Sequence, residues 1–459
     1  MFVDQRGLPL TTASEQAAIV FDSTIDSYLA LKRDTGLLLK SALQADPDMV
    51  MAHCLKGYFF KLMAAGPLEA RAAETQAKAE TLATDSTARE QAHVAALGHW
   101  CNDNHAAACA VWDSILAEYP LDVLAMRLSH HAHFYAGDGP TMRAVVEGAL
   151  PDWGPAIPGY GFVLGMRSFA CEESGDYRTA EVVGREAVKH NPDDPWAIHA
   201  VAHVMEMEDR RCEGAAWITS HEDHWLPANN FRFHLWWHRA LIHLEVGDLD
   251  EVLRLYDENL WDPTSDEYLD LCNDAAILLR LEMLGVDVGG RWAPLAEKVR
   301  ERTEEHILTF IDAHFAIILS AVGEMDAVQY LIKTMKAKGG YVREHVGVPL
   351  LNAILDYQHA GYERAATILN QVRDEIVLIG GSHAQRDLFE WMLIDSLIKS
   401  GNLNRAKSFL FERTLARPEN AASWQRYGEV LAGLGDSIGA AAAEEKVTQL
   451  TTILTEISP

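Results

Sequence analysis

The sequence predicts an all-α fold built from repeated helical hairpins. Ala, Leu, Glu and Met are abundant, alternating strand patterns are lacking, and Gly or Pro interrupts the chain at short intervals. Gly-Asp pairs, which suit tight turns between helices, recur at Gly137-Asp138, Gly175-Asp176, Gly247-Asp248 and Gly435-Asp436. Together these observations favour helices joined by short turns over any fold that contains a sheet.

Individual elements follow from local signals. Thr12-Ala-Ser-Glu15 has the form of a capping box and precedes the first apolar segment, so it predicts the start of a helix. Further along, residues 168–189 predict two helices that turn at Gly175-Asp176 and stop at Asn191-Pro192.

Gly, Pro and small residues recur at regular spacings along the chain. Ala406 and Ala440 are 34 residues apart, and Pro47 and Gly57 keep the ten-residue spacing of Pro418 and Gly428. Small residues at these spacings let the two helices of a hairpin approach closely, which is the signature of the tetratricopeptide repeat. We therefore expect one helical-repeat array over residues 1–459, with histidine-rich central repeats at 162–260 and regular C-terminal repeats at 387–459.

Three segments depart from this repeat spacing. Residues 139–161 contain four prolines and five glycines around Trp153. Residues 285–292 and 336–349 are irregular in the same way. Such loops either cap a groove of a repeat array or simply connect its parts, and for residues 139–161 we expect a capping or connecting loop.

Composition and charge restrict the partners and the cellular compartment that we expect for this protein. The chain has 39 Lys and Arg against 67 Asp and Glu, a formal charge of −28, which argues against nucleic acid and anionic membranes as partners. Its six cysteines form no C-x-x-C pair, the N-terminus has no signal-peptide pattern, and no apolar run reaches membrane-spanning length. These features predict a cytoplasmic protein and leave formation of a homo-oligomer open.

Histidines cluster in the centre of the chain. Eight of the 20 histidines lie between His190 and His243, more than even scatter would give. His199 and His203 are four residues apart, as are His234 and His238, so each pair lies on one face of a helix. Carboxylates extend both faces, at Glu206 and Glu245, and Trp237 adjoins the second pair.

The stretch that carries these pairs resembles a known family. The run WAIHAVAHVMEMEDRRCEGAAWI and the later HLWWHRALIHLEVGDLDEVLRLYD are similar to tetratricopeptide repeat protein 38 and its bacterial relatives. DAAILLRLEMLGVDVGGRW and FIDAHFAIILSAVG resemble further segments of that family. The resemblance implies a right-handed solenoid of helical hairpins, which can close into a compact bowl. It places the histidine pairs on the concave surface and implies no particular reaction.

Three interpretations of the histidines remain open. In the first, His199, His203, His234 and His238 bind zinc, iron, manganese or nickel, although no H-E-x-x-H motif is present. In the second, His203, Glu206 and His238 perform acid/base catalysis without a metal. In the third, the histidines satisfy polar groups between packed repeats. Further candidate binding residues are His199, His234, Glu245, Trp237, Asp312, His314, His383 and Arg386, of which Arg386 is a potential anion anchor.

Two classes of function follow. In one, a concave pocket lined by His, Glu and Trp binds a small molecule or short peptide and can hydrolyse or otherwise transform it, with a divalent metal as a candidate cofactor. In the other, the array is a non-catalytic scaffold for protein–protein interaction. Scaffold grooves of this fold commonly use Lys, Arg and Asn, so the His, Glu and Trp composition favours the pocket.

Overall fold

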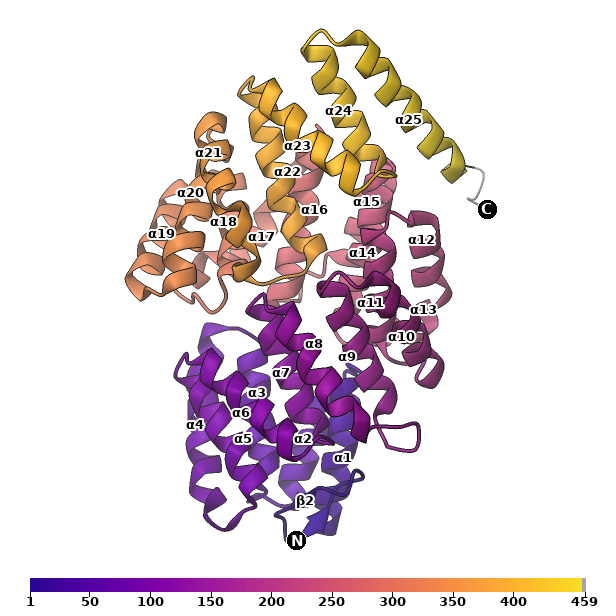
Figure 1. The fold of residues 1–459 in the computed structure, drawn as a ribbon. Coiled ribbons are helices and arrows are strands. Elements are labelled where there is room, and N and C mark those ends of the chain that lie inside the picture. Colours follow the sequence, from indigo (N-terminus) through magenta and orange to yellow (C-terminus); the bar gives the residue numbers. More distant parts are fainter. Residues whose placement is uncertain (456–459) are drawn as a thin grey trace. The chain divides into compact units, whose positions relative to one another are not determined.

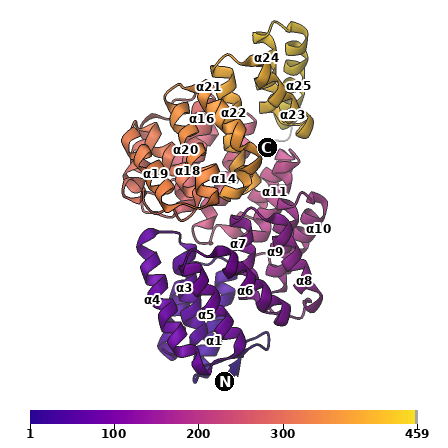
Figure 2. The same cartoon turned by 60° about the vertical axis from the view of Figure 1, so that its left-hand side comes forward.

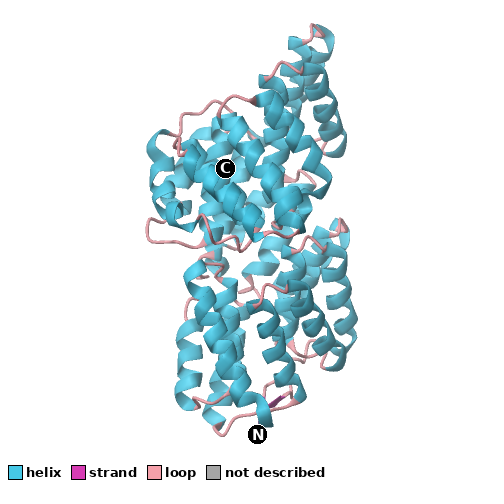
Figure 3. Cartoon of the chain, turned by 90° about the vertical axis from the view of Figure 1, so that its left-hand side faces the viewer, coloured by secondary structure: helices cyan, strands magenta, loops and turns pink. Residues whose placement is uncertain are grey.

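Helical hairpins follow one another along the chain, joined by short loops (Figure 1, Figure 3). The computed structural model describes residues 1–455. In this range the strands are β1 (Phe2–Val3) and β2 (Pro9–Leu10), which pair antiparallel with Phe2 opposite Leu10. The predicted all-α fold of helical hairpins is confirmed.

The helices group into two compact units. Unit 1 comprises residues 1–204 and 220–232, and unit 2 comprises residues 205–219 and 233–459. The division falls inside α11 (Pro195–Met207) and α14 (Phe231–Glu245), and before the last residue of α12 (Arg211–Ser220). These helices therefore contribute residues to each unit.

Unit 1 is a series of antiparallel hairpins in which α1 packs on α2, α3 on α4, α5 on α6, α7 on α8 and α9 on α10. Its helices are α1 (Glu15–Leu29), α2 (Thr35–Ala45), α3 (Val50–Leu62), α4 (Gly66–Leu82), α5 (Ala88–Cys101), α6 (His105–Glu118), α7 (Val123–Tyr135), α8 (Gly139–Ala149), α9 (Tyr160–Glu173), α10 (Tyr177–His190) and α13 (Glu222–Trp225). Two 3-10 turns follow α4 and α8, namely η1 (Ala83–Asp85) and η2 (Leu150–Asp152). Trp112, Trp225 and Tyr58 are among its largest fully buried side chains.

Unit 2 repeats the same arrangement, and Figure 2 shows α18, α19 and α20 side by side in it. Its helices are α12 (Arg211–Ser220), whose last residue belongs to unit 1, α15 (Leu249–Leu255), α16 (Tyr268–Met283), α17 (Trp292–Val299), α18 (Thr309–Ala321), α19 (Met325–Lys338), α20 (Val348–Gln358), α21 (Tyr362–Val372), α22 (His383–Lys399), α23 (Leu403–Ala416), α24 (Ala421–Gly433) and α25 (Ser437–Thr455). Short π and 3-10 segments are η3 (Tyr256–Leu260), η4 (Gly289–Arg291), η5 (Arg300–Arg302), η6 (Arg343–Gly347) and η7 (Arg373–Ile379). None of the described helices is long and apolar enough to span a membrane.

The Gly-Asp turns behave as the sequence predicts. Gly175 has φ of 78°, a left-handed conformation that glycine adopts without steric cost, and it ends α9. Asp176 then caps α10, because its side chain accepts a hydrogen bond from the Thr179 amide at 3.2 Å. Gly137, Gly247 and Gly435 have the same sign of φ.

Some local predictions were wrong. Residues 139–161 are not a continuous loop, because α8 occupies their first half, with Asp138 as its N-cap and Pro140 in its first turn, where proline is tolerated. Most of residues 336–349 is helical too, since α19 runs to Lys338 and η6 leads directly into α20. The N-cap of α1 is Ser14, whose side chain accepts from the Ala17 amide, so the capping box predicted at Thr12 does not form.

Candidate functional site on helices α11 and α14

The first histidine pair lies in unit 1 on α11. Its helix begins at the Asp194 carboxylate, which accepts hydrogen bonds from the amides of Trp196 and Ala197 at 3.0 and 3.3 Å. His199 and His203 are buried, with ring centroids 4.3 Å apart, as i, i+4 spacing requires. The His203 Nδ1 lies 3.6 Å from an oxygen of Glu172, a fully buried carboxylate from α9.

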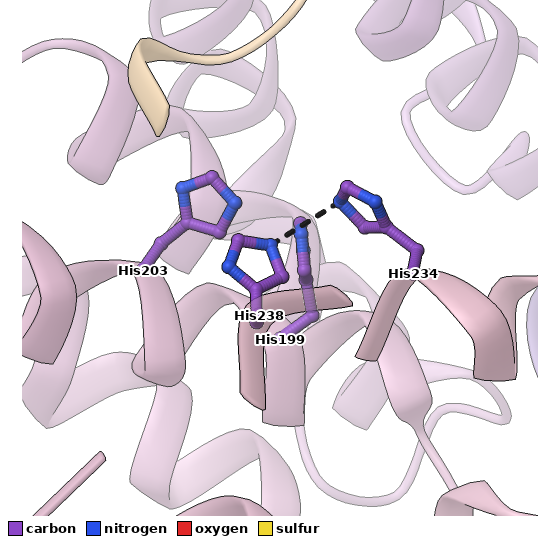
Figure 4. Close-up of side chains that lie close together, drawn as sticks. All are labelled: His199, His203, His234 and His238. Carbon is purple, nitrogen blue, oxygen red and sulfur yellow. Dashed lines mark hydrogen bonds between the residues drawn. The ribbon is translucent and has the colours of Figure 1, made fainter. Parts of the chain in front are cut away.

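The second pair lies in unit 2 on α14. His234 and His238 are buried, and their Nε2 atoms are 3.2 Å apart, as the dashed line in Figure 4 shows. Trp237 stacks on His234 at 5.2 Å between ring centroids with an angle of 12° between the planes. The predicted binding residue Trp237 is therefore a fully buried wall that fixes the orientation of the His234 ring.

Each ring of the second pair is held from outside α14 through its Nδ1. The His238 Nδ1–H donates to Glu206 Oε2 at 2.8 Å, and the His234 Nδ1 lies 3.2 Å from Asn273 Oδ1 on α16. Because both partners are acceptors, the proton of each neutral ring is on Nδ1 and the lone pair is on Nε2. Two Nε2 lone pairs then face each other at 3.2 Å, an arrangement that a cation between or beside them stabilises.

Glu206 also lines a cavity in unit 2. The cavity has a volume of about 50 Å³ and is lined by charged groups and by apolar side chains. These are Glu206, Glu245, Asp387, Asp395, Arg280 and Arg426, and Trp391, Leu241, Leu244, Met283, Leu284, Ala384 and Ala422. Glu245 belongs to an ion network here, since it accepts from Arg211 at 2.7 Å and from Arg417 at 3.2 Å. Although burial raises the pKa of Glu245, the Arg417 and Arg211 charges hold it below its ordinary value.

The other predicted binding residues make local contacts. Asp312 accepts from His306 Nδ1 at 3.1 Å, and His314 donates from Nδ1 to the Phe310 carbonyl of its own helix at 2.8 Å. Burial lowers the pKa of His314 to about 4, so its ring is neutral. His383 begins α22 directly after the Ser382 cap, and Arg386 donates to the Gly381 carbonyl. Their assignment to a ligand site stays a prediction.

Sequence reasoning missed Glu172 and Asn273. Glu172 precedes Glu206 by 34 residues, one repeat period, so the same periodicity that revealed the hairpins could have identified it. Asn273 follows His234 by 39 residues, across α15 and η3, and no regular spacing connects the two.

No family model matches the chain, so membership of the tetratricopeptide repeat protein 38 family stays a prediction. Among solved structures, human IFIT1 as a dimer with PPP-AAAA is 14% identical over 87% of this chain and 90% of its own, with a TM-score of 0.42. Yeast Tom70 is 11% identical over 95% of this chain and 88% of its own, with a TM-score of 0.37. A tetratricopeptide repeat protein from Parabacteroides merdae is 13% identical over 64% of this chain and 95% of its own, with a TM-score of 0.26. None of these likenesses is close enough to inform the function of this chain.

Proposed function

We propose that this helical-repeat protein binds a divalent transition-metal ion through its buried histidine pairs, with His199 and His203 on α11 and His234 and His238 on α14 as ligands, and uses it to bind and hydrolyse a small molecule or short peptide. The observation that carries the proposal is the facing pair of Nε2 atoms on His234 and His238, 3.2 Å apart, with both Nδ1 atoms held by acceptors. Metal-binding histidines commonly have such a partner on the second ring nitrogen, because it fixes the tautomer and the ring orientation.

The spacing of the rings within each pair supports the same proposal. The ring centroids are 4.3 Å apart in the pair on α11 and 4.7 Å apart in the pair on α14. Within unit 1, His199 on α11 contacts Phe231 on α14, with ring centroids 5.1 Å apart. Within unit 2, Glu206 on α11 bonds to His238 on α14. Each pair is therefore held, within its own unit, by a contact between α11 and α14.

The donor set restricts the ion. Neutral imidazoles suit first-row divalent metals, whereas Ca²⁺ and Mg²⁺ prefer oxygen ligands. A histidine pair leaves coordination positions open for water or substrate, whereas a zinc ion with four protein ligands is typical of a structural site. Iron, manganese or nickel with six ligands would keep positions open, so these ions fit a hydrolytic role better. A bound ion of this kind supplies a Lewis acid and lowers the pKa of a coordinated water.

The carboxylates have a defined task in this proposal. Glu206 accepts from the His238 Nδ1–H at 2.8 Å and so orients this ring and raises its basicity, while Glu172 lies 3.6 Å from the His203 Nδ1. Without a metal, the same His238–Glu206 pair would instead be a carboxylate-oriented general base. Metal analysis separates these two mechanisms.

The first experiment measures metal content in protein purified without a histidine tag. We expect about one transition-metal ion per chain by elemental mass spectrometry, and its loss in His203→Ala and His238→Ala. His243→Ala is the matched control, because His243 lies on the same helix and contacts Asp248 instead. Wild-type protein that neither contains a metal nor takes up Zn²⁺, Fe²⁺, Mn²⁺ or Ni²⁺ would refute the metal proposal.

The second experiment tests hydrolysis. Metal-loaded protein is incubated with a panel of short peptides, esters and phosphate esters, and turnover is compared between wild type and His238→Ala. Turnover that requires His238 supports the proposed function. Stoichiometric metal without turnover on any member of the panel would leave a structural metal in a protein-interaction scaffold.

The proposed location is the cytoplasm, as the sequence predicts. All six cysteines are free, and Cys54, Cys109, Cys171 and Cys272 are buried, which suits a reducing compartment. The proposed partner is the small molecule or peptide itself.

A further inference from the structure

Unit 1 contains a buried arginine without a counter-ion in direct contact. Arg127 lies in the middle of α7 and its residue is 2% exposed. Its Nε and Nη2 atoms are buried and have no hydrogen-bond partner among residues 1–455, and the groups that favour its charge electrostatically are Tyr28, Asp194 and Tyr135. An unpaired buried cation is costly, so a protein retains one where a ligand completes its interactions.

Further unsatisfied polar groups surround Arg127. Its guanidinium carbon lies 4.3 Å from the ring of Trp196, whose Nε1–H is also buried without a partner in the described chain. The rings of His130 and His131 contact Trp196 edge-on, with centroids 5.7 and 5.4 Å from it. Both nitrogens of His130 and the Nδ1 of His131 lack partners among the same residues. Several hydrogen-bond donors therefore gather around one indole ring.

The groups around Arg127 carry little charge of their own. Burial, reinforced by the Arg127 charge, holds the pKa of His130 and His131 well below the ordinary value, so both rings are neutral. Burial also raises the pKa of Asp194 to about 7, against the lowering effect of Arg127. The second oxygen of Asp194, Oδ2, has no hydrogen-bond partner within residues 1–455, so Asp194 acts on Arg127 through electrostatics alone. The positive charge of Arg127 is thus incompletely compensated.

We propose that unit 1 holds a binding site for the oxyanion of a small molecule, with Arg127 as its counter-ion and Trp196 and His130 as further donors. Guanidinium groups bind planar or tetrahedral oxyanions through parallel hydrogen bonds, and neutral N–H donors extend that recognition. The shared chemistry is a carboxylate or phosphate group. This site is independent of the metal proposal, since none of Arg127, Trp196 and His130 belongs to the four proposed ligands.

The position of Trp196 relates this site to the first histidine pair. The same indole that stacks under Arg127 contacts His199, with ring centroids 5.3 Å apart. A molecule whose oxyanion is held by Arg127 therefore has its next groups beside His199. The ligand of this part of unit 1 is thus an anionic small molecule.

The test titrates wild-type protein with phosphate, phenyl phosphate, acetate and benzoate, each against sodium chloride at equal ionic strength. Intrinsic tryptophan fluorescence and the midpoint of thermal unfolding are the two readouts. We expect saturable binding and a rise in the midpoint with the phosphates or with the carboxylates, and the series that binds more tightly identifies the anion. Wild-type protein that responds to neither series beyond the chloride control would overturn the proposal.

Substitutions of Arg127 test whether the anion binds at this residue. Arg127→Met should weaken binding of the better series at least tenfold, and Arg127→Lys, which keeps the charge without the planar fork, should weaken it less. Arg143→Gln is the control, because Arg143 is 29% exposed on α8 and pairs with Asp176 at 3.0 Å. Unchanged affinity in Arg127→Met, or equal losses in Arg127→Met and Arg143→Gln, would contradict the assignment.

Stability without ligand separates binding from a structural role. If Arg127 serves a ligand, Arg127→Met removes an uncompensated buried charge and melts no lower than wild type in chloride. If Arg127 instead supports the fold, the methionine variant melts lower or does not fold. The second outcome, together with unchanged anion affinity in Arg127→Lys, would overturn the proposal.

Discussion

The Nδ1 of His238 donates to the Glu206 carboxylate across 2.8 Å, and both side chains are buried. This bond fixes which nitrogen of His238 carries the proton and turns the other nitrogen toward His234. It also connects the second histidine pair to the charged cavity of unit 2, because Glu206 lines that cavity. The first prediction concerns this bond.

Glu206→Gln should lower the affinity for the proposed metal about 10- to 100-fold, because an amide is a weaker acceptor for the imidazole N–H. Competition against a chromophoric chelator measures the change. Circular dichroism should remain that of the wild type. An affinity equal to that of the wild type would show that Glu206 does not support a metal ligand.

Glu245→Gln is the matched comparison and should affect stability rather than metal. Glu245 accepts hydrogen bonds from Arg211, Arg417 and Asn420, so its neutralisation leaves two arginines with one partner fewer. We expect a loss of about 1–3 kcal/mol in the free energy of unfolding, measured by urea denaturation, with metal content unchanged. Loss of metal in this variant would place Glu245 in the site after all.

Asp122→Asn should destabilise unit 1 by about 3–5 kcal/mol at neutral pH. Asp122 is buried, accepts from Arg89 at 2.6 Å and His93 at 3.0 Å, and caps α7 through the Ala125 amide. Although burial raises the pKa of Asp122, the His93 and Arg89 charges hold it well below its ordinary value.

The loss of stability in Asp122→Asn should depend on pH. Because the pKa of Asp122 is lower in the folded state, its stabilising contribution is complete above the unfolded value of about 4 and is lost as pH falls below it. The difference in unfolding free energy between wild type and Asp122→Asn should therefore narrow from pH 6 towards pH 2. A difference that stays constant over this range would show that the lowered pKa contributes nothing.

Gly184→Ala and Gly148→Ala should have opposite effects on stability. A methyl group at Gly184 of α10 would lie 2.5 Å from Ser168 Oγ and Val201 Cγ2, whereas one at Gly148 of α8 meets no atom within 4 Å. We expect a loss of about 1–3 kcal/mol for Gly184→Ala by overpacking. Gly148→Ala should gain about 0.5–1 kcal/mol, because alanine is the better helix former. Equal effects in thermal denaturation would contradict the close hairpin packing.

Features governed by local chemistry could be predicted from the sequence. The turn at Gly175-Asp176 needs only a residue that tolerates positive φ and a capping side chain, and both are adjacent in the chain. The proximity of His234 to His238 follows from helical spacing alone. By contrast, the bonds of His238 to Glu206 and of His234 to Asn273 join separate helices, so their geometry depends on packing. Arg127 gives no signal in sequence, because only the structure shows that its partners are missing.

The division of the chain inside α11 and α14 has a consequence for biosynthesis. Unit 1 requires residues 220–232, which the ribosome makes only after the first residues of unit 2. Its packing therefore cannot be completed until Arg232 has left the exit tunnel, and no single stop codon yields unit 1 without residues 205–219 of unit 2. Each unit is encoded by two separate segments of the gene. A gene for one unit alone must therefore join its two segments directly.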